Sequence, residues 1–215
     1  MTVIQGYLIL ISMSEKLHKK ALQLSYFTVI YNIVEGILSI FVGVSTGGIS
    51  LVGFGLDSFI ESLSGSILIW KFTKSGHISN SHTDKTEQKA IRLISYTFFI
   101  LGSYVLYESI IKLVEQKPPS QGVFGIIIAI ISIIVMIGLY RNKINLGMKN
   151  HIRSLVADSK QTLACIWMSI TMLIGLGLNY FFHIWWSDAV AGVIISMFLF
   201  KEGYNTYKEK KLCSC

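Results

Sequence analysis

Two acidic residues, Asp57 and Glu61, stand four positions apart inside a long apolar run of the sequence. Residues at i and i+4 lie on one face of an α-helix, so the two carboxylates would share a stripe with a spacing of about 6 Å. Two carboxylates held together in an apolar surrounding bind protons in a coupled manner and attract cations. The pair therefore predicts a cation site with coupled protons. The simpler interpretation is two neutral acids that hydrogen-bond to the neighbouring serines.

A second group of candidate ligands follows later in the chain. Asp158, Gln161 and Cys165 are spaced i, i+3 and i+7, which places them on one helical stripe. A lone buried cysteine is more often a small apolar side chain, and a glutamine near a membrane helix end more often bonds to another helix. At the depth of Asp57 and Glu61, however, oxygen and thiolate donors suit a four-coordinate, zinc-like ion better than calcium or magnesium. Asp158 is either an entry ligand or a cap on its own helix.

Three more acidic residues lie within or at the ends of apolar runs. An ionisable residue near the bilayer centre costs about 2.5–3.5 kcal/mol on insertion scales, so such residues usually face a cavity and have a function. Glu35 lies inside its run, with Asn32 a turn away. Glu108 and Asp188 lie near the ends of theirs, where interfacial water is within reach. We therefore expect a structural role for Glu108 and leave Asp188 open between a structural and a functional role.

The composition shows what surrounds these residues. Of the 215 residues, 52% are hydrophobic and only 14% are charged, and the mean hydropathy is +0.58. Soluble domains carry about 25% charged residues, so the bilayer is the expected solvent. Three cysteines in no paired framework exclude a disulfide-stapled secreted domain. The net charge of +7 does not indicate nucleic acid, because the basic residues fall between apolar runs.

Six apolar runs are long enough to cross about 30 Å of hydrocarbon as helices, which takes about 20 residues. They extend approximately over residues 22–44, 50–72, 91–114, 123–140, 155–181 and 186–201. Glycines at 47–48 and prolines at 118–119 predict tight turns between helices. We therefore predict an all-α integral membrane protein with six transmembrane helices. It would comprise an N-terminal segment (1–20), a six-helix domain (21–203) and a short tail (204–215).

The distribution of lysine and arginine predicts the orientation, because positive residues in short loops stay in the cytoplasm. On the other side we place only Lys112 and Lys117. We assign the following residues to the cytoplasmic side: Lys16, Lys19, Lys20, Lys71, Lys74, Lys85, Lys89, Arg92, Arg141, Lys143, Lys149, Arg153, Lys201, Lys208, Lys210 and Lys211. Both termini are therefore predicted to be cytoplasmic.

These motifs together resemble the cation diffusion facilitators. The segments NIVEG (32–36), GGIS (47–50) and LDSFIE (56–61) are similar to the first hairpin of that family, and VADSKQTLAC (156–165) is similar to its fifth helix. The resemblance implies a homodimer of six-helix subunits that exports zinc and similar divalent ions in exchange for protons.

The resemblance also implies a transport site of two residues four apart on the second helix and two residues four apart on the fifth. Asp57 and Glu61 occupy the acidic positions of the second helix. Gln161 and Cys165 stand where the fifth helix commonly has histidine and aspartate. The chain most resembles short members that have this Gln and Cys arrangement and lack a C-terminal cytosolic domain.

We therefore expect a transporter that moves a divalent transition metal, zinc first and cadmium or cobalt as alternatives, out of the cytoplasm by proton antiport. Its metal residues would be Asp57, Glu61, Gln161, Cys165 and Asp158. It would be a multi-pass homodimer in the plasma membrane, with metal ions, protons and lipid as partners, no prosthetic cofactor and no nucleic acid. No catalytic triad or phosphate-binding loop indicates an enzyme. A non-transporting protein of the same fold, which binds metal or modulates a partner, and a passive cation channel remain as alternatives.

Overall fold

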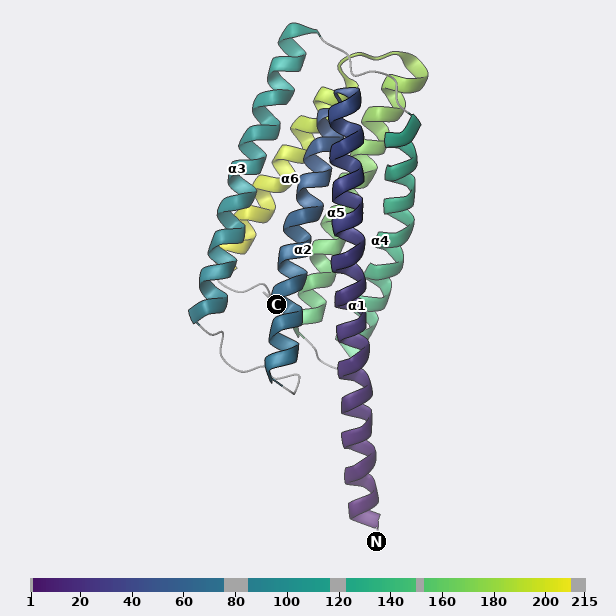
Figure 1. Ribbon diagram of the computed structural model, residues 1–215, viewed down its shortest axis with the longest axis vertical. Helices are drawn as coiled ribbons and strands as arrows, with labels where there is room; N and C mark the ends of the chain where they lie inside the picture. The colour runs from purple at the N-terminus through teal and green to yellow at the C-terminus, as the bar shows by residue number, and fades with distance from the viewer. Residues whose placement is uncertain (1, 76–84, 117–122, 150–152, 210–215) are drawn as a thin grey trace.

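The chain is a bundle of six α-helices in the computed structural model, which describes residues 2–75, 85–116, 123–149 and 153–209 (Figure 1). No strand occurs within these ranges, which confirms the predicted all-α class. The helices are α1 (Thr2–Thr46), α2 (Ile49–Ser75), α3 (Lys85–Glu115), α4 (Val123–Lys149), α5 (Arg153–Phe182) and α6 (Ser187–Glu209).

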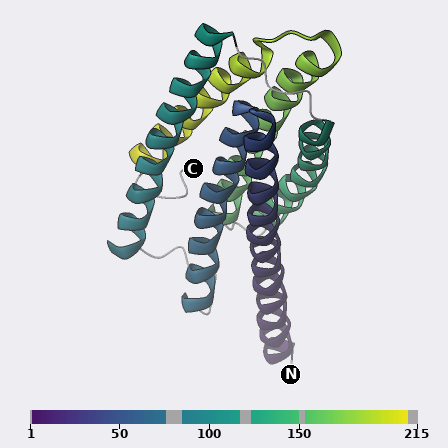
Figure 2. The ribbon, with the colours of Figure 1, turned by 45° about the horizontal axis from the view of Figure 1, so that its top comes forward.

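Successive helices alternate in direction, and α2 occupies the centre. It contacts α1, α3, α5 and α6, while α1 also contacts α4, and α6 packs against α3 and α5. The α1–α2 and α5–α6 turns lie at one end of the bundle, at the top of Figure 1. The start of α1 and the end of α6 lie toward the opposite end in both views (Figures 1 and 2). Any residue on the inner face of α2 is therefore enclosed by several helices.

Five of the helices contain a segment long and apolar enough to cross a membrane: Lys19–Thr46, Ile49–Trp70, Ser95–Glu115, Val123–Lys149 and Asp158–Phe182. The sixth predicted run also forms a helix, α6, which is outside this set. The apolar part of α6 is short, because Asp188 lies at its start and Lys201 and Glu202 lie at its end. The chain is thus a multi-pass membrane protein.

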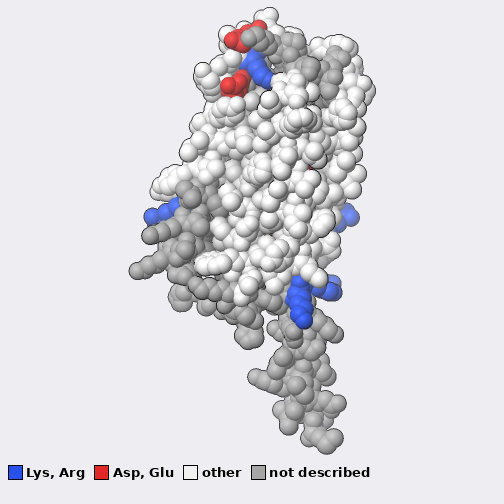
Figure 3. Space-filling view, viewed as in Figure 1, with Lys and Arg blue, Asp and Glu red and all other residues white. Residues whose placement is uncertain are grey.

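The outer surface of the bundle is apolar, and its interior holds many polar side chains beside the apolar core. Among the side chains that the structure describes, large apolar ones with more than 60% of their surface exposed lie on every helix except α2. Many buried side chains, in contrast, are polar, including Ser25, Thr28, Asn32, Ser58 and Ser62. A broad face without charged side chains separates the charged groups at the two ends of the bundle (Figure 3). This distribution suits a protein surrounded by lipid. Hydrocarbon solvates apolar side chains, but polar groups must find hydrogen-bond partners inside the protein.

Glycines set how closely α1 approaches α2. A Cβ atom added at Gly36 would lie 2.9 Å from the carbonyl oxygen of Gly55, closer than side chains normally approach. The helices are joined by Gly47, whose φ of +71° is in the left-handed region, and the amide of Gly48 donates to the carbonyl of Gly43 at 2.9 Å. This left-handed cap ends α1 and lets α2 fold back directly along it.

Several helices extend further than predicted, and α6 continues to Glu209, into the predicted tail. Helix α1 begins at Thr2, so most of the predicted N-terminal segment continues the first span as helix. Helix α4 ends at Lys149, nine residues beyond the predicted end at Tyr140. Arg141 and Lys143 are therefore helical residues, and they do not lie in a loop.

Candidate metal site

The acidic pair on α2 lies in the interior of the bundle. Asp57 and Glu61 are 5% and 1% exposed, and both are near the middle of the span Ile49–Trp70. Asp57 makes no hydrogen bond or ion pair within the part of the chain that the structure describes. The Oε2 atom of Glu61 likewise has no hydrogen-bond partner among those residues. Most buried polar atoms are hydrogen-bonded, so free carboxylate oxygens at this depth require an explanation.

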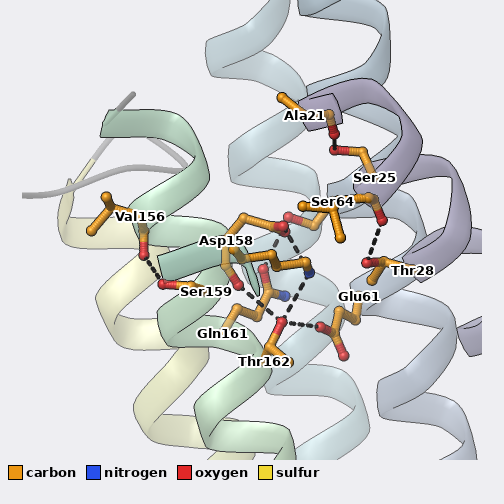
Figure 4. Close-up of polar contacts among 12 residues, drawn as sticks. Ala21, Ser25, Thr28, Glu61, Ser64, Val156, Asp158, Ser159, Gln161 and Thr162 are labelled. Atoms are coloured by element: carbon orange, nitrogen blue, oxygen red, sulfur yellow. Dashed lines mark hydrogen bonds and ion pairs between the residues drawn. The ribbon is translucent and has the colours of Figure 1, made fainter. Parts of the chain in front are cut away.

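The second oxygen of Glu61 is linked to α5. The hydroxyl of Thr162 lies 3.1 Å from Glu61 Oε1 and also 3.1 Å from the backbone carbonyl of Asp158, so its single proton is shared between two acceptors. Figure 4 shows the contacts of Thr162 with the side chain of Glu61 and with the backbone carbonyl of Asp158. This contact joins the central helix of the bundle to the helix that carries the other candidate ligands.

Lys143 completes this network from α4. Its ammonium group forms an ion pair with Asp158 Oδ2 at 2.8 Å and donates a hydrogen bond to Thr162 Oγ1 at 3.0 Å. Lys143 is 0% exposed, so its assignment to the positive residues of the cytoplasmic side does not describe its environment. The reason is the extension of α4, whose buried stripe continues past Tyr140. That stripe is Gly125, Ala129, Ser132, Met136, Leu139, Lys143 and Gly147.

The spacing of this stripe is the sequence signal that could have identified Lys143. Its members follow one another at intervals of three or four residues, which is the period of one helix face. A prediction from hydropathy alone ends this helix before its first basic residue, Arg141. Periodicity continues it by two more turns.

The two predicted ligands on α5, Gln161 and Cys165, precede and follow Thr162 in the sequence, and both contact α2. Gln161 is half-buried, and its Oε1 accepts a hydrogen bond of 3.1 Å from the hydroxyl of Ser64 on α2. Cys165 is 1% exposed, and its thiol lies next to the Glu61 carboxylate. The structure thus brings Asp57, Glu61, Gln161 and Cys165 to the contact between α2 and α5.

The four side chains are near one another but do not form a closed ligand set. Among the residues that the structure describes, no three histidine, cysteine, aspartate or glutamate side chains converge as ligands of one ion. Asp158 lies at the same helix contact but is held by Lys143. A metal ion bound here would have to draw the side chains of α2 and α5 closer together.

Glu35 on α1 belongs to a separate hydrogen-bonded group. Tyr31 donates to its Oε1 at 2.8 Å, and Ser58 donates to its Oε2 at 3.0 Å. Both oxygens of this buried acid are therefore used. Asn32, one turn away, is fully buried, and neither polar atom of its amide has a partner in the described part of the chain. Of the buried acids Glu35, Asp57 and Glu61, those with available carboxylate oxygens are therefore the two on α2.

The remaining candidates lie away from this contact. Glu108 is half-buried on α3. Asp188 is fully buried at the start of α6, where it binds the first residues of α2, so its role in the fold is structural. Cys213 and Cys215 lie outside the described residues.

Comparison with known proteins gives matches that include the residues of the candidate site. The family described as "Cation efflux transmembrane domain" matches residues 24–212, which includes both halves of the candidate site. Transmembrane protein 163 of Xenopus laevis is 23% identical over 193 residues, which are 88% of this chain and 67% of that protein. The cadmium, cobalt and zinc/H(+)-K(+) antiporter of Bacillus subtilis is 23% identical over 209 residues, 91% of this chain and 63% of the relative.

An uncharacterized transporter of Methanocaldococcus jannaschii is 25% identical over 187 residues, 83% of this chain and 64% of the relative. The chain thus spans about two thirds of the length of these curated relatives. The matched family region covers the helical bundle from the first span onward, and it contains the acidic pair of α2 and the facing stripe of α5. The chain therefore belongs to the cation efflux family.

Proposed function

We propose that this protein exports a divalent transition-metal ion, zinc in the first place, from the cytoplasm across the plasma membrane in exchange for protons. The ion is the transported substrate. The observation that carries the proposal is the pair of buried acids on α2, because Asp57 and one oxygen of Glu61 have no hydrogen-bond partner among the residues that the structure describes. A bound cation would give these carboxylate oxygens the partner that they lack.

Asp57 and Glu61 supply carboxylate oxygens, Cys165 a thiolate and Gln161 an amide oxygen, which together match the four-coordinate preference of zinc. The thiolate favours zinc and cadmium over magnesium, calcium and manganese. The α2–α5 contact supports this ligand set, since Glu61 already lies beside Cys165 and Ser64 binds Gln161.

Transport requires that the site open to each side in turn. Rocking of helices against one another achieves this in many transporters while the ion stays near the middle of the bilayer. Carboxylates and the thiol that lose protons on binding metal regain them when the ion leaves, so metal movement in one direction drives proton movement in the other. We expect the unit to be a homodimer, as the family resemblance implies.

The test is zinc flux into proteoliposomes that contain the purified full chain, with a zinc-sensitive dye inside, measured with and without a pH gradient. Flux that depends on the gradient is the expected result. Flux indifferent to the gradient would identify a passive channel. Absence of flux with retained zinc binding would identify a non-transporting metal-binding protein.

A further inference from the structure

Lys143 brings a positive charge into the interior of the bundle, directly beside the proposed metal ligands. Its ammonium group is fully buried, and its two bonds reach Asp158 and Thr162 at 2.8 and 3.0 Å. Because Thr162 also bonds to Glu61 at 3.1 Å, the ammonium lies within about 6 Å of a Glu61 oxygen. A buried ammonium without a partner is costly, so the pairing with Asp158 fixes both side chains.

The pairing also changes what Asp158 can do. Asp158 is a candidate ligand because it lies on the same helix stripe as Gln161 and Cys165. Its Oδ2 atom, however, already forms an ion pair with the Lys143 ammonium group. A divalent ion that recruited Asp158 would have to displace the ammonium into an apolar surrounding. Binding at Asp57 and at Oε2 of Glu61, which has no partner among the described residues, displaces no such charge.

We propose that Lys143 is the residue that sets the affinity and charge of the metal site: its ammonium neutralises Asp158 and keeps that carboxylate out of the ligand set. The site then offers a metal ion two acidic side chains from α2 instead of three. A transporter needs such a limit, because an ion held by three carboxylates and a thiolate would be released slowly. The inference rests on the proposed function, in which Asp57 and Glu61 hold the ion.

The test compares zinc affinity by calorimetry for the purified full chain and three variants, all with Cys213→Ser and Cys215→Ser so that the tail cysteines bind no zinc. Lys143→Met removes the ammonium but keeps the length of the side chain. It should bind zinc at least tenfold more tightly, because Asp158 becomes available as a third acid. Lys143→Arg keeps the charge and should bind zinc within threefold of the unaltered protein.

The decisive variant is Lys143→Met combined with Asp158→Asn. It removes both charges of the Lys143–Asp158 ion pair, so it is the variant best able to fold if Lys143→Met alone does not. The double variant should bind zinc within threefold of the unaltered protein, since neither residue belongs to the ligand set. A loss of more than tenfold would show that Asp158 binds the metal and would overturn the inference. Unchanged affinity in Lys143→Met would also overturn it.

These outcomes separate the inference from the proposal on which it rests. If the unaltered protein binds no zinc at all, the proposed function fails and the inference fails with it. If the unaltered protein binds zinc and the double variant does not, only the role of Lys143 is refuted.

Discussion

Asp188, in the first turn of α6, accepts hydrogen bonds from the backbone amides of Ile49 and Ser50 at 2.9 and 3.3 Å, and from the hydroxyl of Ser50. Ile49 and Ser50 are the first residues of α2, and amides at a helix start have no acceptor within their own helix. One buried carboxylate therefore anchors the helix that carries Asp57 and Glu61 to the start of α6.

We predict that Asp188→Ala lowers the free energy of unfolding by about 1–3 kcal/mol, because buried donors lose their acceptor. Asp188→Asn keeps one acceptor oxygen and should lose less. Thermal unfolding in detergent measures both. Zinc affinity should stay within threefold in Asp188→Asn, since the residue is not a ligand. Unaltered stability of Asp188→Ala would refute the capping role.

The close approach of α1 and α2 gives a second stability prediction. A Cβ atom at Gly55 would lie 2.9 Å from Cβ of Ser39 and 3.0 Å from the carbonyl oxygen of Gly36, so Gly55→Ala forces the helices apart. We expect a loss of about 1–3 kcal/mol, as for overpacked cores. The matched control is Gly138→Ala on α4, where nothing lies within 4 Å of the added atom. Equal melting temperatures for the two variants would contradict this packing.

The sequence predicts the helices well because apolar runs are long and the turns are marked by glycine and proline. It also predicts that Asp57 and Glu61 lie at a similar depth in the membrane to Gln161 and Cys165. In the structure, Glu61 of α2 lies beside Cys165 of α5, and Ser64 of α2 bonds to Gln161. Hydropathy misses Lys143, because a lysine at the end of an apolar run is ordinarily a solvated residue. Its burial depends on a tertiary partner, Asp158, that lies in another helix.

The orientation in the membrane is a third prediction, and the bundle offers exposed positions at both ends. Asn145 near the end of α4 and Ser45 near the end of α1 are exposed. In a cysteine-free background, Asn145→Cys should react with an impermeant thiol reagent only from the cytoplasmic side, and Ser45→Cys only from outside. The positive-inside distribution of lysine and arginine is the basis. Labelling in the reverse sense would contradict it.

The thiol of Cys165 gives a prediction about selectivity. A thiolate is a soft ligand, so Cys165→Ser should weaken cadmium binding by at least tenfold more than zinc binding. The thiol must also lose its proton to bind metal, so the serine variant should show a flatter pH dependence of binding. Calorimetry with each metal, in a background that lacks Cys213 and Cys215, measures both effects. An unchanged cadmium-to-zinc ratio would show that the sulfur is only a packing group.

The central claim is that Asp57 and Glu61 hold the transported ion, and zinc flux in proteoliposomes under an imposed pH gradient tests it most directly. Asp57→Asn and Glu61→Gln keep the size of each side chain and remove its charge. Each should reduce flux below a tenth of the unaltered value, because each variant removes one of the two carboxylate charges that would hold the divalent ion. The matched control is Glu35→Gln, a buried acid whose oxygens are already hydrogen-bonded, which should retain at least half the flux. Unaltered zinc flux in Asp57→Asn and Glu61→Gln would contradict the account.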